Sequence, residues 1–302
     1  MLGKIIVGYD GSAEARDALA LGRLLAGLTR GRLILAAILP VKEEAIGLEG
    51  YKTALREDSD RLFAAVLPEL SRLDVETRVA GGDPPAETLH DLAESEGADA
   101  IVLGSTHRGP LGRIYPGSVA ERLLHGAPCA VAVAPRGFAS RPDGEPRVLA
   151  VAFDGSPESQ AALEVASNLA ETAEATLRVV AVHEPFTPGS AAVAPRGTFD
   201  VGAVTQREAM QERLHDAVAE LPAALRAKGL LLKGQAAEEL LRETELGVDL
   251  LIMGSRGRGP LGRVLLGGVS ARVLRSAPCP VLVMPRSAAN EPQPATAAAE
   301  TG

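Results

Sequence analysis

Two glycine-rich segments hold the residues of this chain that are best suited to chemistry. Residues 104–129 read GSTHRGPLGRIYPGSVAERLLHGAPC, and residues 254–279 read GSRGRGPLGRVLLGGVSARVLRSAPC. Glycine lets the backbone approach a ligand closely, and the helix expected after each glycine run offers unpaired N–H donors. Each segment therefore predicts a cradle for an anion such as a phosphate. The alternative is a tight strand–helix connection in which glycine serves packing alone.

Basic residues add local positive charge to both segments of an otherwise acidic chain. The 302 residues include 39 Asp and Glu against 31 Lys and Arg, for a net charge of −8. This balance argues against a nucleic-acid-binding protein, which needs a basic face to neutralise phosphates, but it allows a small cationic pocket. The arginines available to such a pocket are Arg108, Arg113, Arg258 and Arg263.

Two aspartates form the second chemical element. Asp10 and Asp154 each follow an apolar run, in the sequences GYDGS and AFDGS. If these runs are parallel strands, both carboxylates lie at the edge of a sheet where α/β proteins bind ligands. There, an aspartate could accept hydrogen bonds from the hydroxyls of a ribose. It could equally cap the helix that follows.

The elements that must position these residues occur twice. The sequence KIIVGYDGSAEARDALALGRLLA, from Lys4, matches RVLAVAFDGSPESQAALEVASNLA, from Arg147, and ADAIVLGS and CAVAVAPR likewise match VDLLIMGS and CPVLVMPR. A single internal duplication explains these matches. We therefore expect domains at 1–136 and 147–286, a Gly/Pro-rich linker at 137–146 and a disordered tail at 287–302.

Each half alternates short apolar runs with helical patterns. Runs of Val, Ile, Leu and Ala without polar alternation predict strands buried on both faces of a parallel sheet. The expected class is α/β, with two tandem doubly wound parallel-sheet domains that carry helices on both faces. In the first half the strands are expected at 5–7, 33–38, 75–79, 100–103 and 130–134, and the helices near 13–28, 52–73, 85–96 and 118–125.

Local signals refine this expectation. Ser156 followed by Pro157 predicts an N-cap and a first helical residue. The loop at 187–204, longer than its counterpart at 41–50, is expected to be either a lid or a surface insertion. The last apolar runs, AVAVAP and PVLVMP, would leave an exposed strand edge, which favours pairing.

Composition limits the remaining possibilities. The length suits two domains, and 46% hydrophobic residues with 3% aromatics predict cores of Leu, Val, Ile and Ala. Cys129 and Cys279 are interpreted as small buried residues rather than redox or metal residues, and the five histidines lack ligand spacing. The sequence shows neither a secretory leader nor a membrane span, so we expect a cytoplasmic protein.

With these motifs in place, residues 1–286 resemble a tandem-domain universal stress protein. The nucleotide motif of that family is Gly-x2-Gly-x9-Gly-Ser/Thr after the fourth strand, together with an Asp that ends the first strand. In the first copy Gly104, Gly117 and Ser118 match, but His107 replaces the middle glycine. In the second copy Gly254, Gly257 and Gly267 match, but Gly268 stands in place of Ser or Thr.

The resemblance implies an adenine nucleotide alpha hydrolase-like fold that binds ATP, ADP or AMP, either with or without a bound magnesium ion. The adenine and ribose would lie near Asp10 or Asp154 and the end of the second strand, with the phosphates along the glycine segment. The residues assigned to binding are Asp10, Ala37, Leu103, Gly104, His107, Gly117, Ser118 and Val119 in the first half, and Asp154, Val182, Met253, Gly254, Gly257, Gly267, Gly268 and Val269 in the second.

The two departures from the motif have different physical consequences. A positive φ at His107 would cost about 1 kcal/mol or more, although its ring could itself contact phosphate. Gly268 lacks a hydroxyl, which removes one hydrogen bond worth about 1.5–3 kcal/mol if it were made to a charged phosphate. We expect both sites to bind, unequally, with the second more secure in loop geometry.

The function implied by the resemblance is that of a stress-response regulator that binds nucleotide without turning it over. Neither segment contains the Gly-Lys-Ser/Thr of a P-loop, so efficient phosphoryl transfer lacks its electrostatics. Two alternatives stay open: a slow ATPase on the same fold, and an interaction module with empty pockets. The resemblance also suggests that the last strands pair the two domains with each other and that chains associate further.

Overall fold

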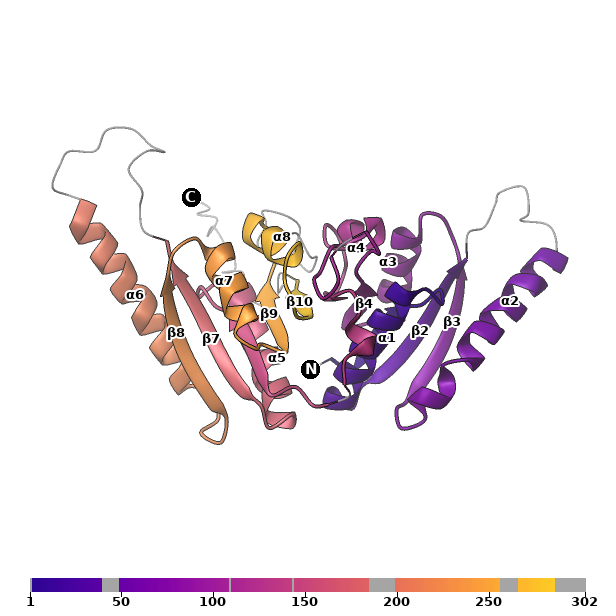
Figure 1. Ribbon diagram of the computed structural model, residues 1–302, viewed down its shortest axis with the longest axis horizontal. Helices are drawn as coiled ribbons and strands as arrows, with labels where there is room; N and C mark the ends of the chain where they lie inside the picture. The colour runs from indigo at the N-terminus through magenta and orange to yellow at the C-terminus, as the bar shows by residue number, and fades with distance from the viewer. Residues whose placement is uncertain are drawn as a thin grey trace, which may run out of the picture.

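The computed structural model describes residues 2–39, 49–108, 110–142, 144–184, 199–255 and 266–285, without the side chains of 49–55 and 199–205. Strands and helices alternate through both halves (Figure 1). The first half comprises β1 (Lys4–Gly8), α1 (Ala13–Thr29), β2 (Arg32–Leu39), α2 (Glu49–Ala64), η2 (Leu67–Leu70), β3 (Val75–Gly81), α3 (Pro85–Glu96), β4 (Ala100–Gly104), α4 (Ser118–Leu123) and β5 (Ala130–Ala134). After η3 (Phe138–Ser140), the second comprises β6 (Val148–Ala152), α5 (Pro157–Thr172), β7 (Thr176–His183), α6 (Phe199–Ala219), β8 (Arg226–Lys233), α7 (Ala236–Glu245), β9 (Leu250–Gly254), α8 (Gly268–Leu274) and β10 (Val281–Met284).

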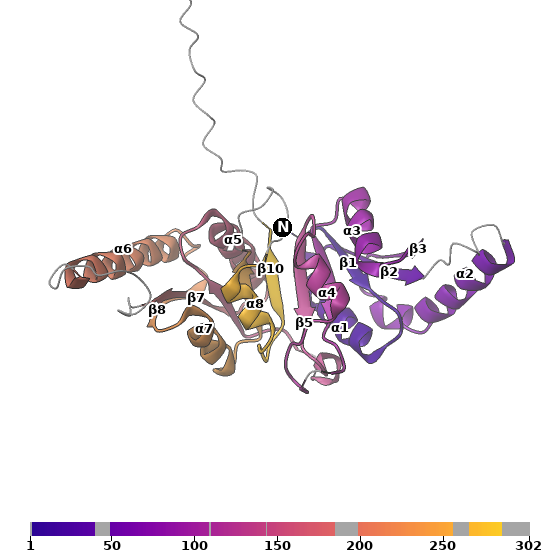
Figure 2. The ribbon, with the colours of Figure 1, turned by 90° about the horizontal axis from the view of Figure 1, so that it is seen from above.

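The described strands form one sheet in the order β3-β2-β1-β4-β5-β10-β9-β6-β7-β8. All neighbours are parallel except β5 and β10, which pair antiparallel with Val281 opposite Val133 and Val283 opposite Val131. Figure 2 shows these two strands side by side at the centre of the molecule. The expected pairing of the domains through their last strands is therefore confirmed within the chain.

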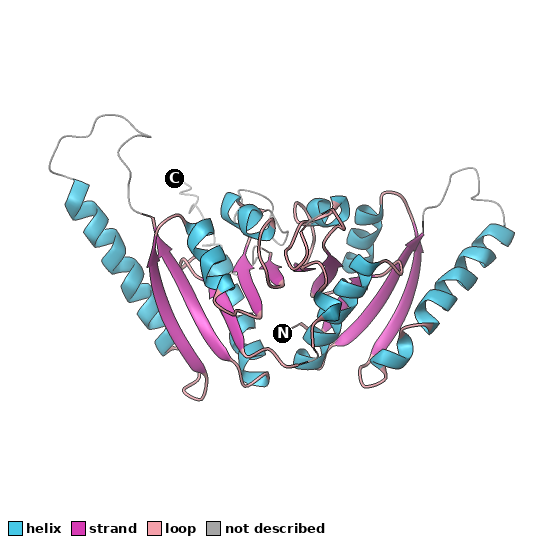
Figure 3. Cartoon of the chain, in the orientation of Figure 1, coloured by secondary structure: helices cyan, strands magenta, loops and turns pink. Residues whose placement is uncertain are grey.

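Helices cover both faces of the sheet, which confirms the doubly wound architecture (Figure 3). Because side chains alternate along a strand, Ile5 and Val7 pack with the α1 and α5 side, whereas Ile6 packs with the side of α3, α4, α7 and α8. Each buried cluster contains residues of both halves. The two cores are therefore continuous across the β5–β10 pair.

Predictions for three elements of the first half need correction: the burial of β3, the length of α2 and the end of α4. Strand β3 is not buried on both faces, and Val79 is 39% exposed, because β3 forms an end of the sheet. The single helix expected at 52–73 is divided into α2 and the short turn η2, where Pro68 cannot donate a backbone hydrogen bond. Helix α4 ends at Leu123, two residues before the predicted end.

The start of α5 follows its predicted signal. The Ser156 side chain accepts a hydrogen bond from Ser159 N, and Pro157 is the first residue of α5. Ser12 caps α1 in the same way, accepting from Ala15 N at 3.1 Å. Residues 199–204 of the predicted long loop belong to α6, and its remainder and the expected tail at 287–302 lie outside the described residues.

A buried carboxylate fastens the linker to the first domain. Asp17 of α1 is 4% exposed, and its two oxygens accept hydrogen bonds from Gly137 N at 2.7 Å and Ala139 N at 2.8 Å.

Among the described residues, no helix combines the length and the apolar character that crossing a bilayer requires.

Candidate functional site

A cavity of about 550 Å³ opens at the carboxyl edge of the first domain, where β1, β2 and β4 end and α1 and α4 begin. Ligand pockets in proteins usually measure about 300–1,000 Å³, and α/β sheets bind ligands at this edge. The predicted site residues that line the cavity are Asp10, Leu103, Gly104, His107, Gly117, Ser118 and Val119.

Ala37 is the exception among the predicted residues of the first domain. It is 4% exposed and does not line the cavity, whereas its neighbours Ala36 and Ile38 do. Strand register also separates Ala37 from Val182: β1 pairs Gly8 with Ala36, and β6 pairs Ala152 with Val180. Since Asp10 and Asp154 each lie two residues beyond Gly8 and Ala152, Val182 corresponds to Ile38. The two residues assigned to binding at the end of the second strand of each half, Ala37 and Val182, therefore do not occupy equivalent positions, and Ala37 is misplaced by one residue.

Asp10 does not cap the helix that follows it. Its Oδ1 accepts a hydrogen bond from Ser12 N at 3.0 Å, and Ser12 is the residue that caps α1. The exposed carboxylate thus lies in the cavity lining, held by a local turn. Asp154 repeats the arrangement in the second domain, accepting from Ser156 N at 3.0 Å and from Ser156 Oγ at 2.5 Å.

Tyr9, beside Asp10, also lines the cavity. The residue is only 4% exposed and belongs to the apolar cluster on the α1 side of the sheet, and this burial raises the pKa of its phenol.

The first glycine loop, residues 104–118, is closed at its base by a serine that the sequence analysis overlooked. Ser105 is fully buried; its Oγ donates to Ala134 O at 2.7 Å and accepts from Tyr115 N at 3.2 Å. Thr106 N donates to Tyr115 O at 2.9 Å. These bonds bring the end of the loop back beside its start. The signal for Ser105 was the Gly-Ser pair that both repeats share, since Ser255 follows Gly254 and is equally buried.

The two matching glycines of this loop have different functions. A Cβ on Gly104 would lie 1.9 Å from the carbonyl oxygen of Glu14, so glycine is needed there for the strand to pass the first turn of α1. At Gly117 a Cβ would meet only Thr106 Cβ, at an ordinary 3.8 Å, and φ is −81°. The packing of the protein itself does not require glycine at position 117.

His107, which replaces the middle glycine of the motif, incurs no backbone penalty. It is not among the described residues with positive φ, so the expected cost of about 1 kcal/mol does not arise. Its Nδ1 lies 3.2 Å from Glu14 Oε1, and both residues line the cavity. Glu14 is therefore a second residue of the site that the sequence analysis missed.

The two arginines of the first glycine loop, Arg108 and Arg113, lie in different surroundings. Arg108 lines the cavity as expected. Arg113 does not: its Nη1 donates to Ser276 O at 2.7 Å and its Nη2 lies 2.8 Å from Glu245 Oε1, both in the second domain. The expectation that Arg113 contributes charge to the pocket was wrong, because the contact between domains occupies its guanidinium. Arg258 and Arg263 lie outside the described residues.

The second domain repeats the framework as far as the structure describes it. Gly267 is the N-cap of α8, which begins at Gly268 and continues through Val269. A Cβ on Gly254 would lie 2.7 Å from Glu158 Cβ, so the first glycine again permits close packing, here of β9 against the first turn of α5. Met253 is 3% exposed at the end of β9, and Gly257 lies outside the described residues.

Comparison with known proteins finds the same family in both halves of the chain. A sequence model described as the universal stress protein family matches residues 1–135 and again 146–285. The chain belongs to the universal stress protein family. It is 31% identical over 292 residues to a universal stress protein of Mycolicibacterium smegmatis, covering 93% of this chain and 96% of that one.

Two further relatives bear on the tandem arrangement. A universal stress protein of Thermus aquaticus is 33% identical over 140 residues, which span 46% of this chain but 98% of the relative. The crystal structure of a universal stress protein from Archaeoglobus fulgidus has the same fold over 95% of this chain and 97% of that one, with a TM-score of 0.62 and 20% identity. Two universal stress protein units are thus joined in one polypeptide.

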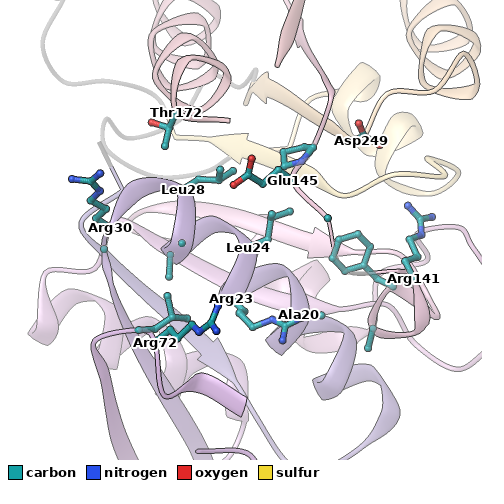
Figure 4. Close-up of a pocket in the computed structure, with 18 of the residues that line it drawn as sticks. Ala20, Arg23, Leu24, Leu28, Arg30, Arg72, Arg141, Glu145, Thr172 and Asp249 are labelled. Carbon is teal, nitrogen blue, oxygen red and sulfur yellow. The ribbon is translucent and has the colours of Figure 1, made fainter. Parts of the chain in front are cut away.

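A larger groove of about 870 Å³ lies at the opposite edge of the sheet, beside the linker (Figure 4). Its lining includes Asp74 and Asp249, which precede β3 and β9. Since nucleotides bind α/β sheets at the carboxyl ends of the strands, this groove is not the site expected for a universal stress protein. It mixes carboxylates with the arginines Arg23, Arg30, Arg72, Arg141 and Arg147.

Both cysteines are free and buried, as interpreted from the sequence. They begin the segments that lead into β5 and β10. Burial raises the pKa of Cys129 and of Cys279 to about 12. Neither thiol is therefore ionised at neutral pH, and neither is suited to redox or nucleophilic chemistry.

Proposed function

We propose that each domain binds one adenine nucleotide at the carboxyl edge of its half of the sheet. The protein would act in the cytoplasm as a stress-response regulator whose state is set by nucleotide occupancy rather than by turnover. One observation carries the proposal: the 550 Å³ cavity is lined by both halves of the family motif, and it contains Gly117, a glycine that packing does not require.

The lining suits the parts of a nucleotide. Ile38, Leu89 and Leu103 provide an apolar wall for an adenine ring, and the exposed Asp10 carboxylate can accept hydrogen bonds from ribose hydroxyls. A ligand of this kind needs a largely apolar pocket with a few well-placed polar groups, which is what these residues supply.

The phosphates would lie against the start of α4. Gly117 offers no side chain to the first N–H groups of this helix, whereas Ser12 and Ser156 cap α1 and α5. Those N–H groups are therefore left for a ligand. Helix α4 has only six residues, so the attraction comes from individual N–H groups and from Arg108 more than from a helix macrodipole.

Hydrolysis is not expected to be the function. Among the lining residues that the structure describes, none is a lysine that could stabilise charge on a transferring phosphoryl group as the P-loop lysine does. In this proposal the two carboxylates of the described lining, Asp10 and Glu14, face the ribose and His107, so neither is assigned to a magnesium ion. A slow ATPase would be revealed by ADP release that disappears in Asp10→Ala and Asp154→Ala variants.

Association between chains, which the family resemblance suggests, would use surfaces other than the last strands. Strands β5 and β10 pair with each other within the chain, so neither leaves a free edge for a second copy. Light scattering coupled to size-exclusion chromatography measures whether two chains associate.

Calorimetric titration of ATP, ADP and AMP into nucleotide-stripped protein tests the proposal. We expect two sites in the wild type and the loss of one in each of Gly117→Asp and Gly267→Asp. Aspartate is a good N-cap, so the helix is retained while its carboxylate takes the N–H groups and repels phosphate. Gly126→Asp, where a Cβ meets open space, is the matched control. An absence of binding heat, or titrations that neither variant alters, would favour an interaction module with empty pockets.

A further inference from the structure

We propose that the second domain positions the first glycine loop for nucleotide binding, through contacts with Arg113 and Ile114. This inference rests on the proposed nucleotide function and adds a dependence between the two domains. It assigns a role in the first site to three residues of the other half of the chain: Glu245, which ends α7, and Ser276 and Ala277, which follow α8.

The main-chain contact is made at Ile114. Its N–H donates to Ala277 O at 2.9 Å, across the boundary between the domains. The Ile114 side chain is fully buried and belongs to the same apolar cluster as Val273 and Leu274 of α8. This part of the loop is consequently packed as core, not as a free surface connection.

The side-chain contact is made at Arg113. Its guanidinium donates to Ser276 O at 2.7 Å and pairs with Glu245 Oε1 at 2.8 Å. The same loop is also tied to its own domain, because Gly112 N donates to Arg136 O at 2.9 Å and Arg136 N donates to Arg113 O at 3.2 Å. The loop is thus held from both sides.

These anchors lie close in sequence to the proposed phosphate position. Only Tyr115 and Pro116 separate Ile114 from Gly117, and both line the cavity. Tyr115 is fixed to Ser105 and Thr106 by the hydrogen bonds at the base of the loop. Since only two residues intervene, a shift at Ile114 that moves Tyr115 would also displace Gly117 and the first N–H groups of α4.

The contact in the second domain also adjoins the second site. Ser276 N and Ala277 N donate to Val273 O at 3.1 and 2.9 Å, so they form the turn that ends α8. Helix α8 begins at the second site, beside Gly267. The same short helix therefore contacts the first glycine loop at one end and the proposed second phosphate position at the other.

The Arg113–Glu245 pair allows a test that separates positioning from folding. Its side chains are 40% and 51% exposed, so the pair contributes little to the free energy of unfolding. A purely structural contact would change affinity only as far as it lowers stability. A positioning contact would change the affinity of the first site while the thermal unfolding midpoint stays the same.

The experiment uses the full chain carrying Gly267→Asp, so that ATP titrates only the first site. We expect Arg113→Ala to weaken ATP binding about tenfold, because the glycine loop loses the side-chain contact that positions it, and Glu245→Gln to weaken it about threefold. Combining Arg113→Glu with Glu245→Arg should recover part of the affinity that Arg113→Glu alone removes. Arg122→Ala removes an equal charge from α4, where the guanidinium pairs with Glu87 of the first domain, and should bind as the parent does.

Three results would overturn the inference: unchanged affinity in both Arg113→Ala and Glu245→Gln, no recovery in the charge reversal, or a loss of affinity matched by a loss of thermal stability. Should the Gly267→Asp parent bind no nucleotide while the wild type also binds none, the proposed function itself is wrong. Should the parent bind and the variants bind equally well, only the dependence on the second domain is wrong.

Discussion

The Nδ1 atom of His107 lies 3.2 Å from Oε1 of Glu14, and both side chains line the cavity of the first domain. The histidine stands where the family motif has glycine, and the glutamate belongs to the first turn of α1. The Glu14 side chain is 24% exposed and the His107 side chain 73% exposed. A carboxylate is thus held in the cavity lining in which the phosphates are proposed to bind.

Removing this carboxylate should tighten nucleotide binding at the first site. In Glu14→Gln a negative charge near the phosphates is lost, which is worth about 1 kcal/mol, or about fivefold in affinity, in a partly solvated site. The gain should be larger for ATP than for AMP because ATP carries more charge. Calorimetry in the Gly267→Asp background measures both affinities.

The control for this prediction is Glu171→Gln, which removes the same charge at an exposed position near the end of α5. Equal affinities for Glu14→Gln and its parent would show that Glu14 does not face the phosphates.

Two glycines of one motif should respond differently to the same substitution. Gly104→Ala forces a Cβ against the Glu14 backbone and should lower the free energy of unfolding by about 3 kcal/mol or more. Gly117→Ala should leave stability nearly unchanged, because a weaker N-cap is offset by a less flexible unfolded chain. Its effect should appear in ATP affinity, since the new methyl group occupies space in front of the helix.

Urea unfolding and ATP titration of the two variants check this pair of outcomes. If Gly117→Ala binds ATP as tightly as the wild type, the phosphates do not approach that position. If Gly104→Ala is as stable as the wild type, the close packing of β4 on α1 relaxes without cost.

Asp17→Ala should lower the free energy of unfolding by about 3 kcal/mol, because two N–H groups of the linker lose a buried, charged acceptor. Asp17→Asn keeps one acceptor oxygen and should lose less. Asp91→Ala, an exposed aspartate of α3, provides the control. Equal midpoints of urea unfolding for Asp17→Ala and Asp91→Ala would contradict the role assigned to this anchor.

The two thiols should resist modification in the folded protein. With pKa values of about 12, roughly one thiol in ten thousand is ionised near pH 8, and burial blocks access as well. Iodoacetamide should therefore label neither Cys129 nor Cys279 until the protein is unfolded in guanidinium chloride. Labelling should rise with pH, since only the thiolate reacts. Rapid labelling of the native protein, located by mass spectrometry, would show that one cysteine is accessible.

The sequence predicted most of the fold because its signals are local or repeated. The apolar runs located the described strands of the first half, and Ser156-Pro157 located the start of α5. The prediction that β3 is buried on both faces failed, although its sequence VETRVAG already alternates polar and apolar residues. The prediction of a single helix at 52–73 also failed at Pro68, which interrupts the helical pattern after α2.

The candidate site was only partly predictable. Motif spacing and the family resemblance predicted that Asp10, Gly104, Gly117 and Ser118 share one site, and all four line one cavity. Motif spacing could not show that Gly104 is needed for packing while Gly117 is not, because that depends on how closely α1 approaches β4. Glu14 was missed for the same reason, since only the packed helix places it opposite the loop.

By itself, the sequence determined that this is a duplicated α/β chain of the universal stress protein family, because periodicity, turn residues and motif spacing are properties of contiguous residues. The tertiary structure alone decided which side chains serve the site and which join the domains. Arg113 shows the difference: its spacing suggested a phosphate ligand, but the antiparallel pairing of β5 with β10 places its guanidinium against Ser276 and Glu245. Contacts between residues more than a hundred positions apart depend on how the sheet is assembled, and no local pattern encodes them.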